Sequence, residues 1–150
     1  IIRGLMVRSG GQQFVVPLDC IEETVKISPE SIRHYKDVLV ADIRGGILHL
    51  IPLHEILGMK KTASSEESGN GRISVIVVEV DGSRFGLIVD SFNKEQEFVV
   101  KALDEDLARL KVYTGASILG DGNVVLILNP AQLFNLFLSS RKEGEAQWLQ

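Results

Sequence analysis

The sequence predicts an all-β protein, made mainly of strands with short helices, in which two small barrels share one core. Two observations predict this fold class. Apolar and polar residues alternate over many short segments that are separated by turn residues. The two halves of the chain also match each other at a nearly fixed spacing. With 150 residues, the chain can bury a substantial core without disulfide bonds or structural metals.

Two β-hairpins open the two halves of the chain. The first covers residues 5–18 and turns at Ser9-Gly10-Gly11, whereas the second covers residues 75–89 and turns at Asp81-Gly82. An Asp-Gly pair suits a two-residue turn because glycine adopts positive φ at no steric cost. The second hairpin repeats the first 71 residues later, so that Phe85 corresponds to Phe14.

A second match aligns residues 44–57 with residues 120–133, at an offset of 76. Two matches in the same order favour an internal duplication. Each copy then holds a hairpin, a further strand, another hairpin and a short apolar helix. Five or so short strands are too few to bury both faces of a flat sheet, so each half is expected to close into a small barrel.

Short helices are expected at the end of each copy and in two connections. Gly58 suits the position after a helix, and Pro130 suits the first turn of one. Further helices are expected after Ser28-Pro29 and over residues 103–110, where acidic residues come first. The predicted domain spans residues 1–138 and includes a polar, mobile loop at 60–72. Residues 139–150 are expected to form a polar C-terminal tail that frays.

Charge and cysteine content exclude several classes of partner. The formal net charge is −4, and the 16 basic residues are spread along the chain, so nucleic acid is not an expected partner. The single cysteine, Cys20, suits a reducing cytoplasm. No apolar run is long enough to insert into a membrane. The chain starts at Ile1 within a predicted strand, so we expect it to belong to a longer protein.

Residues with catalytic or metal-binding chemistry do not gather into a motif. The histidines lack the spacing of a zinc-binding helix, and adjacent carboxylates such as Glu22-Glu23 point to opposite faces of a strand. Asp19 would raise the pKa of the Cys20 thiol. We therefore predict no catalytic residue, cofactor or metal, and expect binding through apolar surface. The candidates for an exposed apolar patch, with ordinary core positions as the alternative, are Ile21, Val25, Val99 and Leu119.

Two long stretches resemble a known family. Residues 86–103, followed by residues 115–134, closely resemble the C-terminal regulatory domain of the chemotaxis histidine kinase CheA, and more broadly the CheW-like domain. Residues 2–23 and 51–58 are similar to the opening hairpin and the strand-to-helix step of that family. The resemblance implies two intertwined, five-stranded SH3-like barrels and a role in two-component signal transduction.

The resemblance also implies partners and binding residues. The domain would bind the coupling protein CheW and the cytoplasmic tips of chemoreceptors, and would pass the receptor state to the ATP-binding domain of the same kinase. This places it in the cytoplasm, at receptor arrays on the inner side of the membrane, with the catalytic kinase domains upstream of Ile1. By motif, receptor coupling falls on Ile21, Glu23, Arg44 and Gly45.

Two other functions are compatible with the sequence. The chain could be a stand-alone CheW-type adaptor, which would have a start methionine just before Ile1. It could also be a small β-barrel that binds a ligand or catalyses hydrolysis, for which ionisable side chains should converge in a pocket.

Overall fold

The computed structural model describes residues 1–61 and 71–148, with side chains up to Arg141. Most of the predicted polar loop at 60–72 therefore lies outside the described residues. The first half of the chain contains β1 (Ile2–Ser9), β2 (Gln12–Pro17), β3 (Ile21–Ile27), β4 (Arg33–Tyr35), β5 (Val38–Ile43), β6 (Gly46–Pro52) and α1 (Leu53–Ile56). The second half contains β7 (Ile73–Val80), β8 (Ser83–Val89), β9 (Ser91–Phe98), α2 (Glu105–Ala108), β10 (Tyr113–Ile118), β11 (Val124–Leu128) and α3 (Pro130–Trp148).

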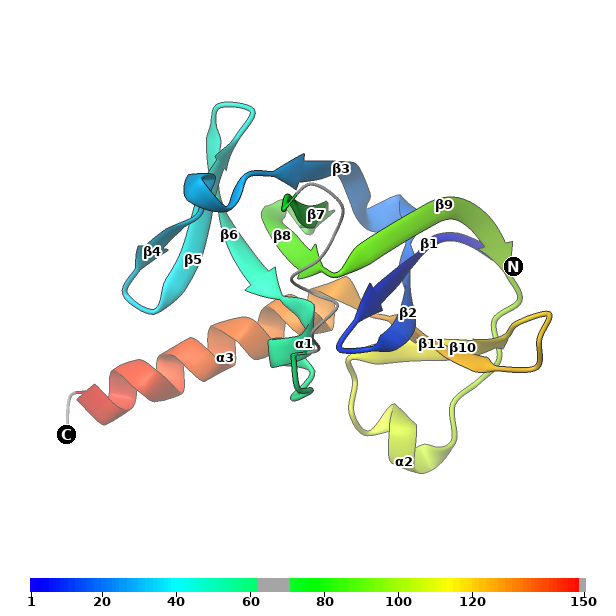
Figure 1. The fold of residues 1–150 in the computed structure, drawn as a ribbon. Helices are drawn as coiled ribbons and strands as arrows, with labels where there is room; N and C mark the ends of the chain where they lie inside the picture. The colour runs from blue at the N-terminus through cyan, green and yellow to red at the C-terminus, as the bar shows by residue number, and fades with distance from the viewer. Residues whose placement is uncertain (62–70, 149–150) are drawn as a thin grey trace.

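The strands form two sheets, and each sheet takes strands from both halves of the chain. The five-stranded sheet, which we call barrel 1, has the order β10-β11-β2-β1-β9. The six-stranded sheet, barrel 2, has the order β3-β7-β8-β6-β5-β4. The chain crosses from barrel 1 to barrel 2 after β2 and back to barrel 1 after β8, so the two barrels are intertwined as expected (Figure 1). Barrel 2 has one strand more than expected because the short β4 adds to its edge.

Strand register confirms the internal duplication. Val7 pairs with Phe92, and Val78, which lies 71 residues after Val7, pairs in the same way with Ile21. The parallel strand pairs also correspond, since Phe14 pairs with Leu126 and Phe85 with His49. Leu126 lies 77 residues after His49, so the offset of 76 is wrong for the last strand of each copy. Between corresponding pairs, Ile118 with Val124 and Asp42 with Ile47, the second copy has five residues and the first copy has four.

The core has three parts, and strand alternation explains them. Side chains on one face of the central strands, such as Phe14 and Phe85, form a cluster between the barrels. Side chains on the opposite face point into the barrels, so that Met6 and Val15 fill barrel 1 and Val77 fills barrel 2. The predicted shared core is present, and each barrel has an apolar interior in addition. Burial on both faces explains why these strands read as nearly continuous apolar runs.

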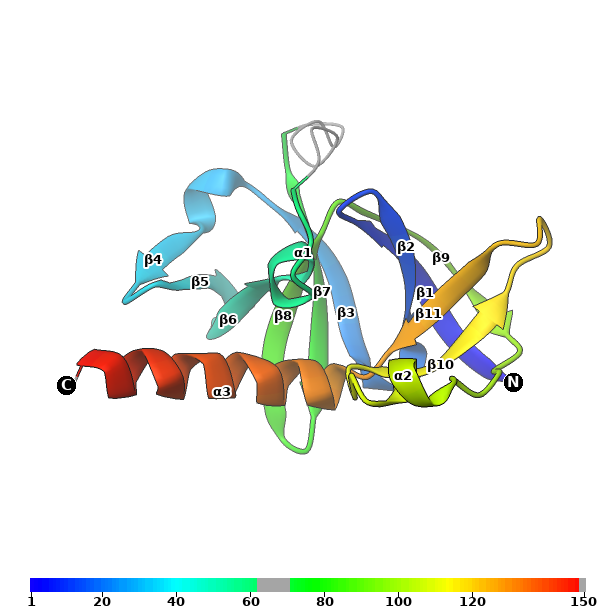
Figure 2. The ribbon, with the colours of Figure 1, turned by 90° about the horizontal axis from the view of Figure 1, so that it is seen from below.

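Helix α3 is longer than expected. It begins at Pro130 as predicted and continues to Trp148, so the expectation of a frayed tail is wrong for residues 139–148. Leu133 is fully buried, and the ring of Phe134 stacks on Phe85 with centroids 4.8 Å apart. These contacts anchor the first turns of α3 to the barrels. The residues that follow include Arg, Lys, Glu, Ala and Gln, which have high helix propensity, and the helix continues past the barrels (Figure 2). No helix among the described residues has the length and apolar character needed to cross a membrane.

The shorter helices agree in part with expectation. Helix α2 is capped by Asp104, whose carboxylate accepts a hydrogen bond of 2.9 Å from the Leu107 N–H. Gly58 adopts φ +71° directly after the α1 region. The helix expected after Ser28 is only a short 3₁₀ turn at Pro29–Ser31. Ile32 and the extended β4 follow it directly, so no room is left for a longer helix.

Candidate partner-binding surfaces

The residues predicted to bind partners lie in two separate places. Ile21, Glu23 and Val25 lie on β3, and Arg44 and Gly45 form the turn between β5 and β6, so all five belong to barrel 2. Val99 and Leu119 belong to barrel 1, where Val99 follows β9 and Leu119 follows β10. The structure brings Glu23 and Arg44 together although they are 21 residues apart in the chain.

An ion pair fixes the barrel 2 group. Arg44 Nε donates a hydrogen bond of 2.7 Å to Glu23 Oε1, and this bond, with the charge of Glu23, raises the pKa of the Arg44 guanidinium. The turn itself needs positive φ at both residues, 53° at Arg44 and 81° at Gly45. The Gly45 N–H donates to Asp42 Oδ1 at 3.0 Å and holds this turn. The guanidinium therefore occupies a defined place on the surface of barrel 2.

The neighbouring glutamate on β3 makes a second ion pair. Arg84 Nε, on β8, donates to Glu22 Oε2 at 2.7 Å. Successive side chains of a strand point to opposite sides, so Glu22 and Glu23 reach different arginines. This agrees with the prediction that the two carboxylates point to opposite faces of a strand. Their arginine partners were not predicted, because Arg84 is 62 residues away from Glu22 in the chain.

Three of the four apolar candidates are half-buried. Ile21 packs against the cluster between the barrels, Val25 against the interior of barrel 2, and Leu119 against the interior of barrel 1. Each of them therefore supports a core and also reaches the surface. Val99 differs, because 58% of it is exposed.

Val99 belongs to an exposed apolar surface on barrel 1. Ile118 and Val124 pair directly across β10 and β11 and are 59% and 64% exposed. Lys101 pairs with Ala116, and continuing that antiparallel register by two residues places Val99 next to Ile118. Val99, Ile118 and Val124 thus lie side by side across three segments of chain, and we call them the barrel 1 row. Sequence analysis missed Ile118 and Val124 because alternation cannot tell an outward apolar position from an inward one when both faces are apolar.

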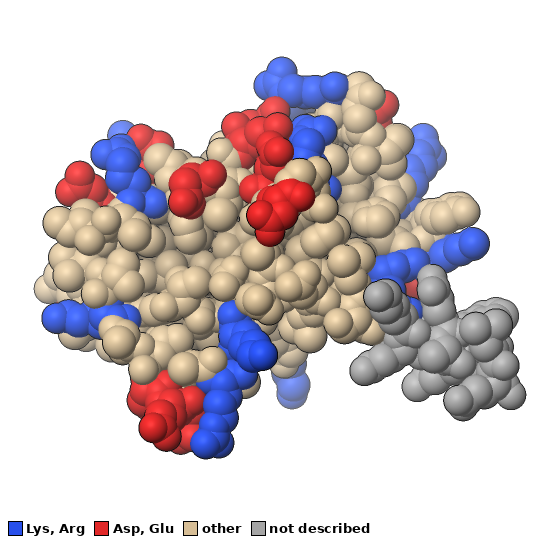
Figure 3. Space-filling model, turned by 180° about the vertical axis from the view of Figure 1, so that it is seen from behind, with Lys and Arg blue, Asp and Glu red and all other residues tan. Residues whose placement is uncertain are grey.

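Charged groups leave part of the surface free. From behind, uncharged side chains form a continuous band across both barrels, and Lys, Arg, Asp and Glu gather above and below it (Figure 3). Another protein can cover such a surface without desolvating a charged group.

Metal ligands do not converge in the described part of the chain. Among those residues, no group of three or more His, Cys, Asp or Glu side chains could hold a metal ion. Burial, and then the charge and hydrogen bonding of Asp19, raise the pKa of the Cys20 thiol to about 11. A thiol with that pKa is almost entirely protonated near neutral pH and is a poor nucleophile.

The intertwined barrels and their surfaces define a class of signalling domain. The family model of the CheW-like domain matches residues 3–137, and the chain belongs to this family. The family resemblance found in the sequence is confirmed.

Similar proteins carry the name "Chemotaxis protein CheA". The one from Treponema pallidum is 32% identical over 138 residues, which are 92% of this chain and 17% of the relative. The one from Bacillus subtilis is 33% identical over 129 residues, which are 86% of this chain and 19% of the relative. The chain therefore spans about a fifth of the length of these relatives.

A solved structure shows the same fold. The scaffolding protein TtCheW from Thermoanaerobacter tengcongensis superimposes with a TM-score of 0.64 at 20% sequence identity, over 85% of this chain and 88% of that one. At this identity the likeness concerns the fold, and it agrees with the all-β CheW-like architecture predicted from the sequence.

Proposed function

We propose that this chain is the regulatory domain of a chemotaxis histidine kinase, and that it couples receptors to the kinase by contact and not by catalysis. In this proposal it binds the coupling protein CheW and the cytoplasmic tips of chemoreceptors, and it passes the receptor state to the ATP-binding domain of its parent protein. It would act in the cytoplasm, at receptor arrays on the inner side of the membrane.

The barrel 1 row is the observation that carries this proposal. Three aliphatic side chains that are each more than half exposed lie side by side at one end of a barrel. When a similar barrel covers these side chains, they lose apolar area that was accessible to water. Each Å² buried in this way favours binding by about 25 cal/mol. We assign CheW binding to this row, with Leu119 beside it, and receptor contact to Ile21, Glu23, Val25, Arg44 and Gly45 on barrel 2.

A stand-alone CheW-type adaptor is the second candidate. The fold of TtCheW favours it, because that scaffolding protein is 88% covered by this chain. The names and the length of the CheA relatives favour the kinase domain. The gene upstream of Ile1 separates the two, since an adaptor requires a start codon near that point.

Titration calorimetry with a CheW-type coupling protein from the same organism tests the barrel 1 row. Val124→Lys and Ile118→Lys should each weaken binding at least about tenfold, because an ammonium group must then be desolvated in an apolar contact.

Ile47→Lys is the matched control for that titration. Ile47 on β6 of barrel 2 corresponds to Val124 on barrel 1, since it pairs with Asp42 as Val124 pairs with Ile118. Ile47 is 69% exposed. It should leave CheW affinity unchanged. Equal weakening by Ile47→Lys, or native affinity of Val124→Lys with an unchanged melting curve, would contradict the assignment of CheW binding to barrel 1.

A further inference from the structure

Barrel 2 has a pocket at one of its ends. A pocket of about 580 Å³ lies where β7 and β5 begin and where β6 and β8 end. This is the end of barrel 2 opposite the Arg44-Gly45 turn, so the pocket is distinct from the surface assigned to receptor contact. Its volume is within the usual range of ligand pockets, about 300–1,000 Å³.

The difference between the two barrels has a local cause. In barrel 1, the Lys101 N–H donates to the Ala116 carbonyl at 2.7 Å and the Ala116 N–H donates to the Lys101 carbonyl at 3.0 Å, which closes the barrel. This approach requires Gly115, because a Cβ there would lie 2.8 Å from Val100 Cγ1 and 3.0 Å from the Lys101 oxygen. Leu39 occupies the same position in barrel 2, since it pairs with Leu50 as Gly115 pairs with Ile127.

The chain therefore takes a different course in barrel 2. After β3 it turns outward through Pro29 and returns as β4, which pairs with β5 on one side only. Within the described residues, β4 and β3 are the two ends of the sheet. An edge strand offers unpaired backbone groups to an extended segment of another chain.

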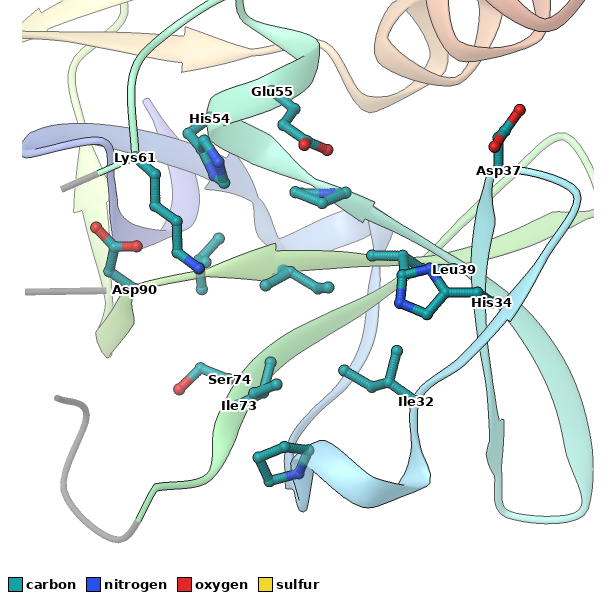
Figure 4. Close-up of a pocket in the computed structure, with 14 residues that line it drawn as sticks. Ile32, His34, Asp37, Leu39, His54, Glu55, Lys61, Ile73, Ser74 and Asp90 are labelled. Carbon is teal, nitrogen blue, oxygen red and sulfur yellow. The ribbon is translucent and has the colours of Figure 1, made fainter. Parts of the chain in front are cut away.

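The pocket has an apolar middle and polar ends. Figure 4 shows Ile32, Leu39 and Ile73 across the middle, His34 and Asp37 at one end, and Lys61 and Asp90 at the other. Glu55 lies on the rim at α1. The lining has three carboxylates and one lysine, and Arg33 on the adjoining edge of β4 adds a second cation, so the pocket and this edge together keep a formal charge of −1.

We propose that this pocket and the adjoining edge of β4, which together we call the barrel 2 groove, bind an extended segment of a partner protein. The segment has an aliphatic side chain at its centre and basic residues on either side. Its backbone pairs with Arg33–Tyr35 of β4, its aliphatic side chain enters the pocket between Leu39 and Ile73, and its basic groups face Asp37, Glu55 and Asp90. The groove is on the other barrel from the row assigned to CheW, so it goes beyond the proposed function.

The test uses three acetylated and amidated eight-residue peptides. The first alternates lysine and valine, the second has glutamate in place of lysine, and the third has serine in place of valine. Each is titrated into the isotopically labelled chain, and amide chemical shifts are followed by NMR. The basic valine peptide should give saturable shifts, with a dissociation constant below the millimolar range, at Arg33–Tyr35 and at the pocket residues. The other two peptides should bind at least about tenfold more weakly.

Charge variants of the chain sharpen this test. The double variant with Glu55→Gln and Asp90→Asn should bind the basic valine peptide at least about threefold more weakly at low salt. Asp37→Asn, at an exposed position, should also weaken binding of the basic valine peptide. It serves as a second variant if the double substitution disturbs folding. Glu105→Gln with Asp106→Asn, on α2, removes the same number of charges far from the groove and should have no effect.

Three results would overturn the inference. They are the absence of saturable shifts with the basic valine peptide, equal binding of all three peptides, and shifts that map to the barrel 1 row. Self-association of the chain through β4, seen as concentration-dependent line broadening without peptide, would show that a second copy occupies the groove. A failure here leaves the CheW titration untouched, because its variants lie on barrel 1.

Discussion

The two barrels descend from the same arrangement of strands and differ in how they close. Corresponding residues pair in the same register in both, including the irregularity where β3 and β9 cross the central hairpins. Barrel 1 is closed by its own chain at Lys101 and Ala116 and presents three exposed aliphatic side chains. Barrel 2 presents the Glu23–Arg44 pair at one end and the open groove at the other.

The comparison shows how a duplicated fold acquires unlike surfaces. The inward positions are apolar in both copies because both must fill a barrel and a shared core. The outward positions carry no such requirement, so one end became apolar and the other charged. The close approach that closes barrel 1 leaves no room for a Cβ at Gly115, and leucine occupies the corresponding position, 39, in barrel 2.

The largest expected effect concerns the core that the barrels share. Phe85→Ala and Phe14→Ala should each lower the free energy of unfolding by about 3–5 kcal/mol. Phe85 should be the more sensitive, because its ring stacks on Phe134 at 4.8 Å, whereas Phe14 and Tyr113 are 6.4 Å apart. Urea denaturation measures both.

Both variants should unfold in one cooperative transition, since each phenylalanine belongs to the cluster between the barrels. Two separate transitions, one sensitive to each substitution, would show that the barrels are independent units.

The next largest effect concerns the closure of barrel 1 between Lys101 and Ala116. Gly115→Val should lower the free energy of unfolding by about 1–3 kcal/mol, because the new side chain forces Val100 and the Lys101 carbonyl away. The amide protons of Lys101 and Ala116 should then exchange with solvent faster, which hydrogen exchange measures.

Gly120→Val is the matched control, since a Cβ at Gly120 meets nothing within 4 Å. If both substitutions cost the same, the close approach at Gly115 does not govern the effect.

The smallest effect concerns surface ion pairs on the two barrels. Arg84→Met removes the pair with Glu22 on barrel 2 and should cost about 0.2–1 kcal/mol. Arg3→Met removes the pair with Glu95 on barrel 1 and a looser pair, at 3.9 Å, with Glu97. The Arg3 and Glu95 side chains are 54% and 50% exposed, compared with 36% and 37% for Arg84 and Glu22. Arg3→Met should cost less, because the charges are better solvated.

Denaturation at low and high salt checks this order. A larger loss from Arg3→Met than from Arg84→Met would contradict the role of exposure.

Much of the fold follows from local patterns. The Asp81-Gly82 turn, the start of α3 at Pro130 and the offset of 71 between the hairpins were all predicted, because each depends on residues close together in the chain. The length of α3 was not predicted, since the polar composition of residues 139–148 hid its helical propensity. The partner-binding surfaces were predicted only in part, and Ile118 and Val124 were missed.

By itself, the sequence determined the strand-rich class, the duplication and the turns, because backbone preferences and alternation act over a few residues. Only the tertiary structure decided which arginine meets which glutamate, which aliphatic side chains face outward and which barrel stays open. Those outcomes depend on groups that are tens of residues apart and meet only when the sheets form. The physical reason is that side-chain exposure and close backbone approach are properties of packed neighbours, which no single segment of the chain contains.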